Sequence, residues 1–347
     1  MPPMTQKNET GILVLSLLIT LGLIGGAYLW ITKNSQVKFI SANNTTQQTN
    51  SQSNIDTFAQ VENVPSGLFR YGGSTTWAPI RKEVDSAIKT VLPKYQLNYT
   101  DPISSAPGSG TGIKMLLDNQ LAFSQSSRSV KPEEYQLAEQ KGFKLKEIPV
   151  AIDGIALVVN PKLNISGLTI AQIKDIYTGK VTNWKELGGS DLAIIPYSRR
   201  LSDGGTIEFF YENILEKQNF GTNVQFIPTT TEALREVAKN EGSIYYASAP
   251  EAVPQCSVKP LPIGRKPGEF VPPYQVPPVL QSECPQKVNK LNADAFQNGV
   301  YPITRSLFVI VKQNGQIDQQ AGEKYAELLM TNQGQDLISK AGFVRIK

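Results

Sequence analysis

The sequence IPVAIDGIALVVN, residues 148–160, is a long apolar run rich in β-branched isoleucine and valine. Residues of this kind favour extended strands. A strand of this length is suited to crossing from one compact lobe to another. We therefore expect the chain to pass between two lobes near Val150 and Ala151, and to return near Tyr301 and Pro302, so that the two crossings form a hinge.

Strands and helices alternate on both sides of this run. Expected strands lie at 68–71, 95–99, 121–124, 194–198 and 306–311. Segments with the spacing of amphipathic helices follow most of them, and the C-terminal segment 319–339 reads as one further helix. Such alternation predicts an α/β fold with mostly parallel sheets, whose ligands lie at the carboxyl ends of the strands.

Three short turns rich in glycine and hydroxyl groups each open a segment with helical spacing. They are GGSTTW at 72–77, PGSGTG at 107–112 and RRLSDGGT at 199–206. A helix N-terminus leaves backbone N–H groups without partners and carries a partial positive charge. Glycine lets an anion approach that backbone, and hydroxyl groups add donors. Together with the arginine pair at 199–200, these turns predict a buried oxyanion site.

The composition argues against several classes of function. The chain has 347 residues, enough for two or three domains, and a net charge of +4. That charge is too small and too scattered for a nucleic-acid-binding protein. Histidine is absent, which removes histidine-based catalysis and most zinc sites. We therefore expect a binding protein without metal or cofactor, and a phosphohydrolase is disfavoured because no activated nucleophile is evident.

The N-terminal region predicts a membrane attachment. Residues 1–10 form a flank, and residues 11–31, GILVLSLLITLGLIGGAYLWI, contain no charge. A helix of this length spans the hydrocarbon layer of a membrane. We expect a retained single-pass transmembrane anchor. A cleaved signal peptide is the alternative, against which stand the length of the run and the lack of a clear cleavage site.

The segment that follows, residues 32–67, is expected to be a disordered tether. Its central part, SANNTTQQTNSQSN at 41–54, has no charge and one apolar residue, so it has almost nothing to bury. A globular body would then be held near the membrane and remain free to reorient.

The chain has two cysteines, Cys256 and Cys284, which bracket a proline-rich and irregular stretch at 260–285. They could form a disulfide or remain two free thiols. The expected anchor and tether favour the disulfide, and with it an extracytoplasmic or periplasmic location at the inner (plasma) membrane.

Five motifs, in this order, resemble the phosphate-binding protein of bacterial Pst-type ABC importers, a type II periplasmic-binding-protein family. They are GSTTWAP at 73–79, GSGTG at 108–112, IYTGKVTNW at 176–184, RLSDGGT at 200–206 and YPIT at 301–304. The resemblance covers about residues 68–347. It implies a lobe one made of residues 68–150 plus 302–347, and a lobe two made of residues 151–301.

The resemblance also implies a ligand and its site. Inorganic phosphate, or a similar oxyanion, would lie between the lobes and be delivered to an ABC permease. A tethered phosphate sensor or sequestering protein is the alternative. The residues that match the family's binding positions are Thr75, Thr76, Ser109, Gly110, Ser127, Arg200, Gly204, Gly205 and Thr206. Arg199 has a smaller expected role, and Trp77 and Trp184 are interpreted as packing residues.

Two departures from the family pattern concern selectivity. The family uses an aspartate after the third strand to accept the proton of hydrogen phosphate, and here Ser127 stands at that place, beside Arg128. A family serine is replaced by Gly204, with Asp203 just before it as an alternative acceptor. A serine both accepts and donates hydrogen bonds, so we expect weaker discrimination between phosphate and other oxyanions.

Overall fold

The computed structural model describes residues 56–201 and 204–346. The expected flank 1–10, the expected anchor 11–31 and most of the expected tether lie outside the described residues. Among the helices of the described ranges, none combines the length and the hydrophobicity that a membrane span requires.

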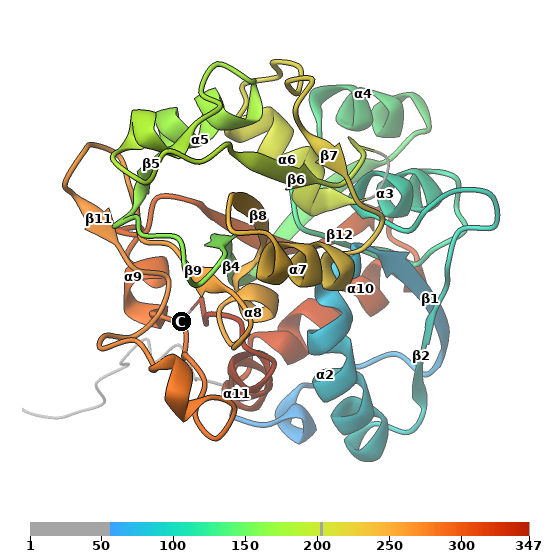
Figure 1. Cartoon of the computed structure of the whole chain (residues 1–347). Coiled ribbons are helices and arrows are strands. Elements are labelled where there is room, and N and C mark those ends of the chain that lie inside the picture. Colours follow the sequence, from blue (N-terminus) through green and yellow to red (C-terminus); the bar gives the residue numbers. More distant parts are fainter. Residues whose placement is uncertain (1–55, 202–203, 347) are drawn as a thin grey trace, which may run out of the picture. The chain divides into compact units, whose positions relative to one another are not determined.

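The first part of the described chain forms one half of an α/β body (Figure 1). Its elements are the 3-10 helix η1 (Phe58–Gln60), β1 (Gly67–Gly73), the 3-10 helix η2 (Thr75–Trp77), α2 (Ala78–Val91), β2 (Tyr95–Tyr99), α3 (Ser109–Leu117), β3 (Phe123–Ser126), α4 (Pro132–Gln140) and the long strand β4 (Lys144–Val159).

The second half follows β4, and the chain then returns to the first half through its last strand. The elements are β5 (Leu168–Thr169), α5 (Ile170–Tyr177), η3 (Trp184–Leu187), β6 (Ile195–Ser198), α6 (Gly205–Asn213), β7 (Gln225–Phe226), α7 (Thr230–Lys239), β8 (Ser243–Ser248), α8 (Ala249–Ala252), β9 (Lys259–Pro260), β10 (Ile263–Gly264), β11 (Phe270–Val271), η5 (Gln281–Glu283), α9 (Ala293–Gln297), β12 (Thr304–Gln313), α10 (Ile317–Leu329) and α11 (Asn332–Lys340).

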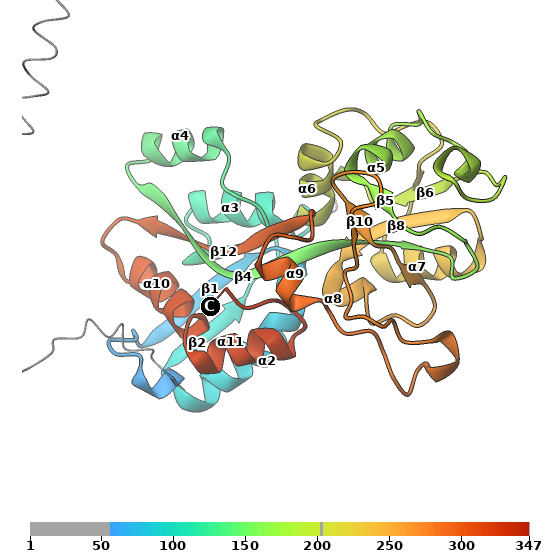
Figure 2. The same cartoon turned by 90° about the vertical axis from the view of Figure 1, so that its left-hand side faces the viewer.

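One sheet runs through both halves in the order β2-β1-β3-β12-β4-β8-β6-β7. The strand β4 joins them: its residues 144–154 pair with β12, and its residues 155–159 pair with β8. Figure 2 shows α2, α3, α4, α10 and α11 around one half of this sheet and α5, α6, α7 and α8 around the other. The expected two-lobed α/β fold is therefore confirmed, with the apolar run at 148–160 inside the crossing strand.

The expectation of mostly parallel sheets is wrong, because the sheet is mixed. Strand β1 is parallel to β2 and β3, and β6 is parallel to β7 and β8. The crossing strands differ: β12 is antiparallel to β3 and β4, and β4 is antiparallel to β8. Since β4 carries the chain out of the first half and the neighbouring β12 brings it back, these two strands must run in opposite directions.

Each half has its own hydrophobic core. One core contains Trp77 and the other contains Trp184, and both side chains are fully buried. Each indole also donates a hydrogen bond, Trp77 Nε1 to Ser126 O at 3.1 Å and Trp184 Nε1 to Gly242 O at 2.9 Å. Both tryptophans are therefore packing residues. The lobe boundaries at 150/151 and 301/302 stay predictions.

The end of the expected tether is ordered, so the expectation of disorder as far as residue 67 is wrong for residues 56–67. Phe58 is fully buried in the core that contains Trp77, and Val61 is nearly so. The amide of Phe58 donates to Gln333 Oε1 of α11 at 2.8 Å. The physical reason is that this part of the chain, unlike the polar stretch 41–54, has apolar side chains that bury against a core formed largely by distant residues.

The C-terminal segment forms two helices where one was expected. Helix α10 ends at Leu329, and Thr331 then caps α11 by accepting a hydrogen bond from the amide of Gly334 at 2.9 Å. The hydroxyl of Thr331 also donates to Leu328 O at 2.7 Å, which closes the last turn of α10. The hydroxyl side chain thus satisfies both helix ends at the break.

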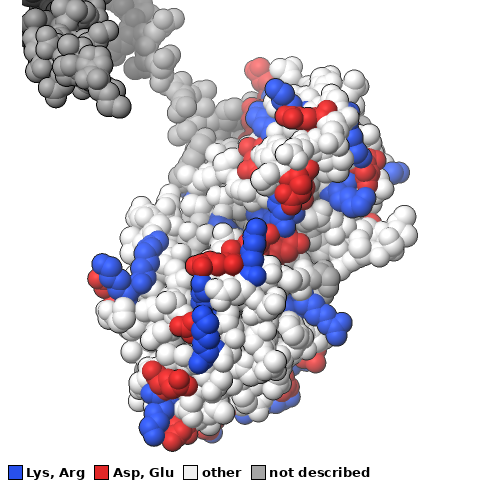
Figure 3. Space-filling model, turned by 90° about the horizontal axis from the view of Figure 1, so that it is seen from above, with Lys and Arg blue, Asp and Glu red and all other residues white. Residues whose placement is uncertain are grey.

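Charged residues of both signs are interspersed on the face of the molecule seen in Figure 3. With a net charge of only +4 over the whole sequence, long-range attraction of an anion by this face is weak. Specific attraction must therefore come from groups placed inside the fold.

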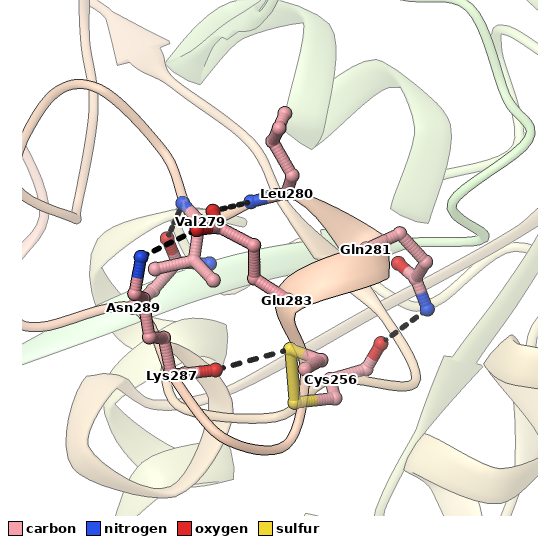
Figure 4. The surroundings of a disulfide bond; sticks show 8 residues. Cys256, Val279, Leu280, Gln281, Glu283, Lys287 and Asn289 are labelled. Atoms are coloured by element: carbon pink, nitrogen blue, oxygen red, sulfur yellow. Dashed lines mark hydrogen bonds and ion pairs between the residues drawn. A yellow bond between two sulfur atoms is a disulfide. The ribbon is translucent and has the colours of Figure 1, made fainter.

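Cys256 and Cys284 form a disulfide, as expected (Figure 4). It joins the loop that follows α8 to the stretch that contains η5. Gln281 Nε2 donates to Cys256 O at 2.8 Å, and the amide of Val279 donates to Asn289 Oδ1 at 2.8 Å. The proline-rich stretch is thus held by a covalent bond and by side-chain contacts. It is not wholly irregular, because its short strands β10 and β11 pair in a second sheet with β5.

Candidate anion-binding site

The three glycine turns of the sequence lie together in the structure. The hydroxyl oxygens of Thr76, in the first turn, and Thr206, in the third, are 3.4 Å apart. A methyl group added at Gly108, in the second turn, would lie 3.3 Å from the Cα atom of Gly204, in the third. Turns from both lobes therefore meet, with the start of α3 and the start of α6 close to η2.

Glycine is required at two points of this arrangement. Gly204 precedes α6 with a φ angle of 131°, a backbone conformation that side chains with a Cβ atom rarely adopt. At Gly112 in α3, a Cβ atom would lie 2.4 Å from the Cα atom of Gly73. Gly112 thus lets α3 pack directly against the first turn.

Ser74, Ser109 and Ser127 form a buried cluster against the start of α6. Ser74 Oγ donates to Ser127 Oγ at 3.0 Å, and the amide of Ser127 donates to Ser109 Oγ at 3.0 Å. A Cβ atom on Gly205 would lie 2.4 Å from Ser127 Oγ and 2.6 Å from Ser109 Oγ. Two of the predicted binding serines are therefore packed tightly against the third turn.

A small cavity of about 30 Å³ is lined by residues of the first and third turns. Of the residues predicted from the sequence, Thr75, Thr76 and Thr206 line it, whereas Ser109, Gly110, Ser127, Gly204 and Gly205 lie in the turns around it. The full lining is Thr75, Thr76, Arg199, Thr206, Ile207, Thr230, Tyr245, Tyr246, Ala247 and Glu251.

The arginine that faces this cavity is Arg199, the neighbour of the one selected by the motif. Arg199 follows β6 and lines the cavity, and its Nε atom is buried without a hydrogen-bond partner among the described residues. Arg200 is exposed and does not line the cavity. A buried cationic donor without a partner is costly unless a ligand satisfies it, so this geometry favours Arg199 as the anion's cation.

Arg305 is a further component of the site that the sequence did not reveal. It lies on β12, immediately after the YPIT motif, and is buried. Its Nη2 atom donates to Thr206 Oγ1 at 2.9 Å and to Thr76 Oγ1 at 3.2 Å. The guanidinium thus donates to one hydroxyl oxygen from the first turn and to one from the third, and holds these two threonines beside each other.

Asp153, on the crossing strand β4, neutralises Arg305. Its Oδ2 atom accepts from Arg305 Nη2 at 2.8 Å and from Arg305 Nε at 2.9 Å, while Ser248 Oγ donates to Oδ1 at 2.7 Å. Complete burial raises the pKa of Asp153, although the charge of Arg305 and these hydrogen bonds act in the opposite direction. An ion pair thus lies at the crossing, with the cavity threonines on one side of it.

Arg128 does not add free positive charge to the cavity. It is nearly fully buried and pairs with Glu134 of α4 and Glu208 of α6, each at 2.8 Å. Burial alone would lower the pKa of Arg128, but the two carboxylates raise it above its usual range. Since Glu134 lies in α4, before the crossing strand β4, and Glu208 lies in α6, after it, Arg128 forms an ionic link between the two halves of the fold.

The comparison with known families agrees with this architecture. The family described as the PBP superfamily domain matches residues 42–333. The chain belongs to the PBP superfamily. In this PBP superfamily member the match includes both crossings, all three glycine turns and the disulfide-bonded insert.

Relatives of this PBP superfamily chain are phosphate-binding proteins by name. Phosphate-binding protein PstS of Staphylococcus epidermidis is 29% identical over 283 residues, which cover 78% of this chain and 77% of the relative. PstS of Pseudomonas aeruginosa is 28% identical over 294 residues, covering 80% and 83%. A structure of a proposed phosphate ABC transporter substrate-binding protein from Clostridium perfringens, with bound phosphate, has a TM-score of 0.63 and 26% identity, covering 81% of this chain and 100% of that one.

Proposed function

We propose that this protein binds inorganic phosphate outside the cytoplasm, in the cavity between its lobes, and delivers it to an ABC permease. The observation that carries this proposal is the cavity itself. It is lined by Arg199, whose buried Nε atom has no partner among the described residues, together with Thr75, Thr76 and Thr206. Relatives named as phosphate-binding proteins support the choice of ligand.

The chemistry of the cavity suits a small tetrahedral anion. Arg199 supplies a planar fork of charged donors, which form stronger hydrogen bonds to oxyanions than neutral donors do. The threonine hydroxyls and the backbone amides at the start of η2 and α6 supply further donors. Ser109, Gly110, Ser127, Gly204 and Gly205 shape the wall behind them. In this proposal Arg199 takes the role that the motif assigned to Arg200.

Binding and lobe closure are coupled in this proposal. Thr75 and Thr76 belong to lobe one, whereas Arg199 and Thr206 belong to lobe two. An anion that contacts both sets is bound fully only when the lobes are together, so it stabilises the closed arrangement. Arg305 contributes because its guanidinium contacts threonines from both lobes.

Calorimetry of the purified full-length chain in detergent tests the ligand. Phosphate, arsenate, sulfate and molybdate are titrated separately at neutral pH. We expect one anion per chain, with phosphate bound most tightly and arsenate close behind it, because both carry a hydrogen at this pH. Absence of binding by all four anions would rule out the proposed function.

We also propose that residues 11–31 anchor the protein in the plasma membrane, with the lobes on its outer face. The uncharged run of apolar residues supports this, and the disulfide supports an oxidising compartment. In cells, the protein is expected to stay in the membrane fraction after alkaline carbonate washing and to keep its N-terminal segment, as checked by intact mass. A soluble chain that lacks this segment would instead identify a cleaved signal peptide.

A further inference from the structure

Glu251 is an acidic residue on the wall of the anion cavity. It lies in α8, one turn after Ser248, and lines the cavity together with Arg199, Thr75 and Thr206. Within residues 56–201 and 204–346, neither oxygen of its carboxylate has a hydrogen-bond or ion-pair partner, although its backbone carbonyl accepts from Gln255. Glu251, which is also exposed to solvent, and Arg199, whose Nε atom has no partner within the described ranges, therefore line the same small cavity.

The surroundings of Glu251 come from several elements, and together they set its charge. Removal of water by the surrounding protein is the largest effect and raises the pKa of Glu251, and Asp153 on β4 raises it further. Arg305 on β12 and Arg199 after β6 lower it. Tyr245 and Tyr246 of β8 also line the cavity, and burial keeps the pKa of Tyr246 far above its usual value, so that phenol is neutral.

A carboxylate in this position treats two kinds of oxyanion differently. Hydrogen phosphate carries an O–H group that can donate to a carboxylate, whereas sulfate at neutral pH has only acceptor oxygens. Placing sulfate beside an unpaired carboxylate brings like charges together without a hydrogen bond between them, which disfavours binding. The same carboxyl group would donate a hydrogen bond to sulfate once it is protonated.

We propose that Glu251 determines specificity in this site, by accepting a hydrogen bond from the hydroxyl group of a protonated oxyanion and by repelling fully ionised ones. The inference rests on the proposed function and deepens it. Ser127 stands where the related phosphate-binding family has an acceptor aspartate, and it is packed against Ser109 and Gly205. Glu251 supplies the acceptor from the opposite lobe.

The test compares Glu251→Gln with the wild-type full-length chain in calorimetric titrations of phosphate and sulfate. The variant removes the negative charge with little change in shape, and the side chain of Glu251 has no partner to lose among the residues that the structure describes. We expect the ratio of phosphate affinity to sulfate affinity to fall at least tenfold, as the loss of a charged hydrogen bond and of a repulsion would produce. Glu251→Ala should change the ratio in the same direction.

The pH dependence of sulfate binding gives a second readout, because sulfate does not titrate between about pH 5 and pH 8. In the wild-type chain, sulfate affinity should rise as the pH falls, since protonation removes the repelling charge and creates a donor. In Glu251→Gln this dependence should disappear. Glu232→Gln is the matched control: Glu232 lies in the first turn of α7 but does not line the cavity, so it should behave like wild type.

The outcomes separate the two proposals. An unchanged affinity ratio and an unchanged pH dependence in Glu251→Gln would overturn the role of Glu251 while leaving phosphate binding intact. Equal loss of both anions in this variant would also overturn it. A wild-type chain that binds neither anion would contradict the proposed function as well.

Discussion

Replacing Asp153 by asparagine should lower the free energy of unfolding by about 3–5 kcal/mol. Asp153 and Arg305 form an ion pair at 2.8 Å whose side chains are 0% and 2% exposed. Without the carboxylate charge, the guanidinium stays buried beside Ser248 and the cavity threonines with no counter-charge. The desolvation cost of that charge is then uncompensated, and chemical denaturation followed by tryptophan fluorescence measures the loss.

The matched control for this variant is Asp191→Asn. Asp191 pairs with Lys185 at 3.3 Å, but their side chains are 69% and 70% exposed. Exposed pairs contribute about 0–1 kcal/mol because water solvates both partners. Similar small losses in Asp153→Asn and Asp191→Asn would contradict the structural importance of the pair at the crossing.

Replacing Arg199 by alanine should weaken phosphate binding at least tenfold, whereas Arg200→Ala should leave it nearly unchanged. A charged hydrogen bond contributes about 1.5–3 kcal/mol, and 1.4 kcal/mol corresponds to a factor of ten. Arg199 lines the cavity with its Nε atom buried, and Arg200 is exposed. Calorimetric titration of phosphate into both variants measures the difference.

Arg199→Lys distinguishes a bidentate contact from simple charge attraction. Lysine keeps the positive charge but lacks the planar fork of donors, so its affinity should lie between those of wild type and Arg199→Ala. The opposite ranking, with Arg200→Ala losing phosphate and Arg199→Ala keeping it, would return the role to the arginine that the motif selects.

Much of the fold could be predicted from local patterns. The alternation of apolar strands with helical spacing indicates an α/β body, and the run at 148–160 marks the crossing strand because no shorter element suits so long an apolar stretch. The expectation of mostly parallel strands was wrong for the sheet as a whole. Strand direction depends on where the chain leaves and re-enters each half, which no local pattern contains.

The start of the ordered region and the break in the last helical segment were harder to predict. Phe58 and Val61 bury against a core whose other members lie far along the chain, so the ordered part of residues 56–67 has only a faint local signal. The break between α10 and α11 did have a signal, since Thr331 is a hydroxyl residue three positions before Gly334. A helical pattern that continues on both sides of the break conceals it.

The candidate site, too, could be predicted only in part from the sequence. Glycine, serine and threonine in three turns at helix starts already predict donors for an anion, because that chemistry depends on backbone groups at each helix start. The motif favoured Arg200 over Arg199, whereas Arg199 lines the cavity in the structure; the motif alone does not fix this choice, since neighbouring residues at a strand end point in opposite directions. Only the packing of β6 determines which one enters the cavity.

The sequence by itself indicated the α/β class of fold and the turns that carry the donors, and it favoured a disulfide between the two cysteines over two free thiols. The fold class and the turns follow from interactions between residues near one another in the sequence. The disulfide was favoured by the expected anchor and tether, and the chain has only two cysteines that could form it. The tertiary structure alone decided that Arg199 and Glu251 line one small cavity, and that Arg305 donates to Thr206 on the wall of that cavity. These residues come from three distant segments, and their proximity results from how β6, β12 and α8 pack together.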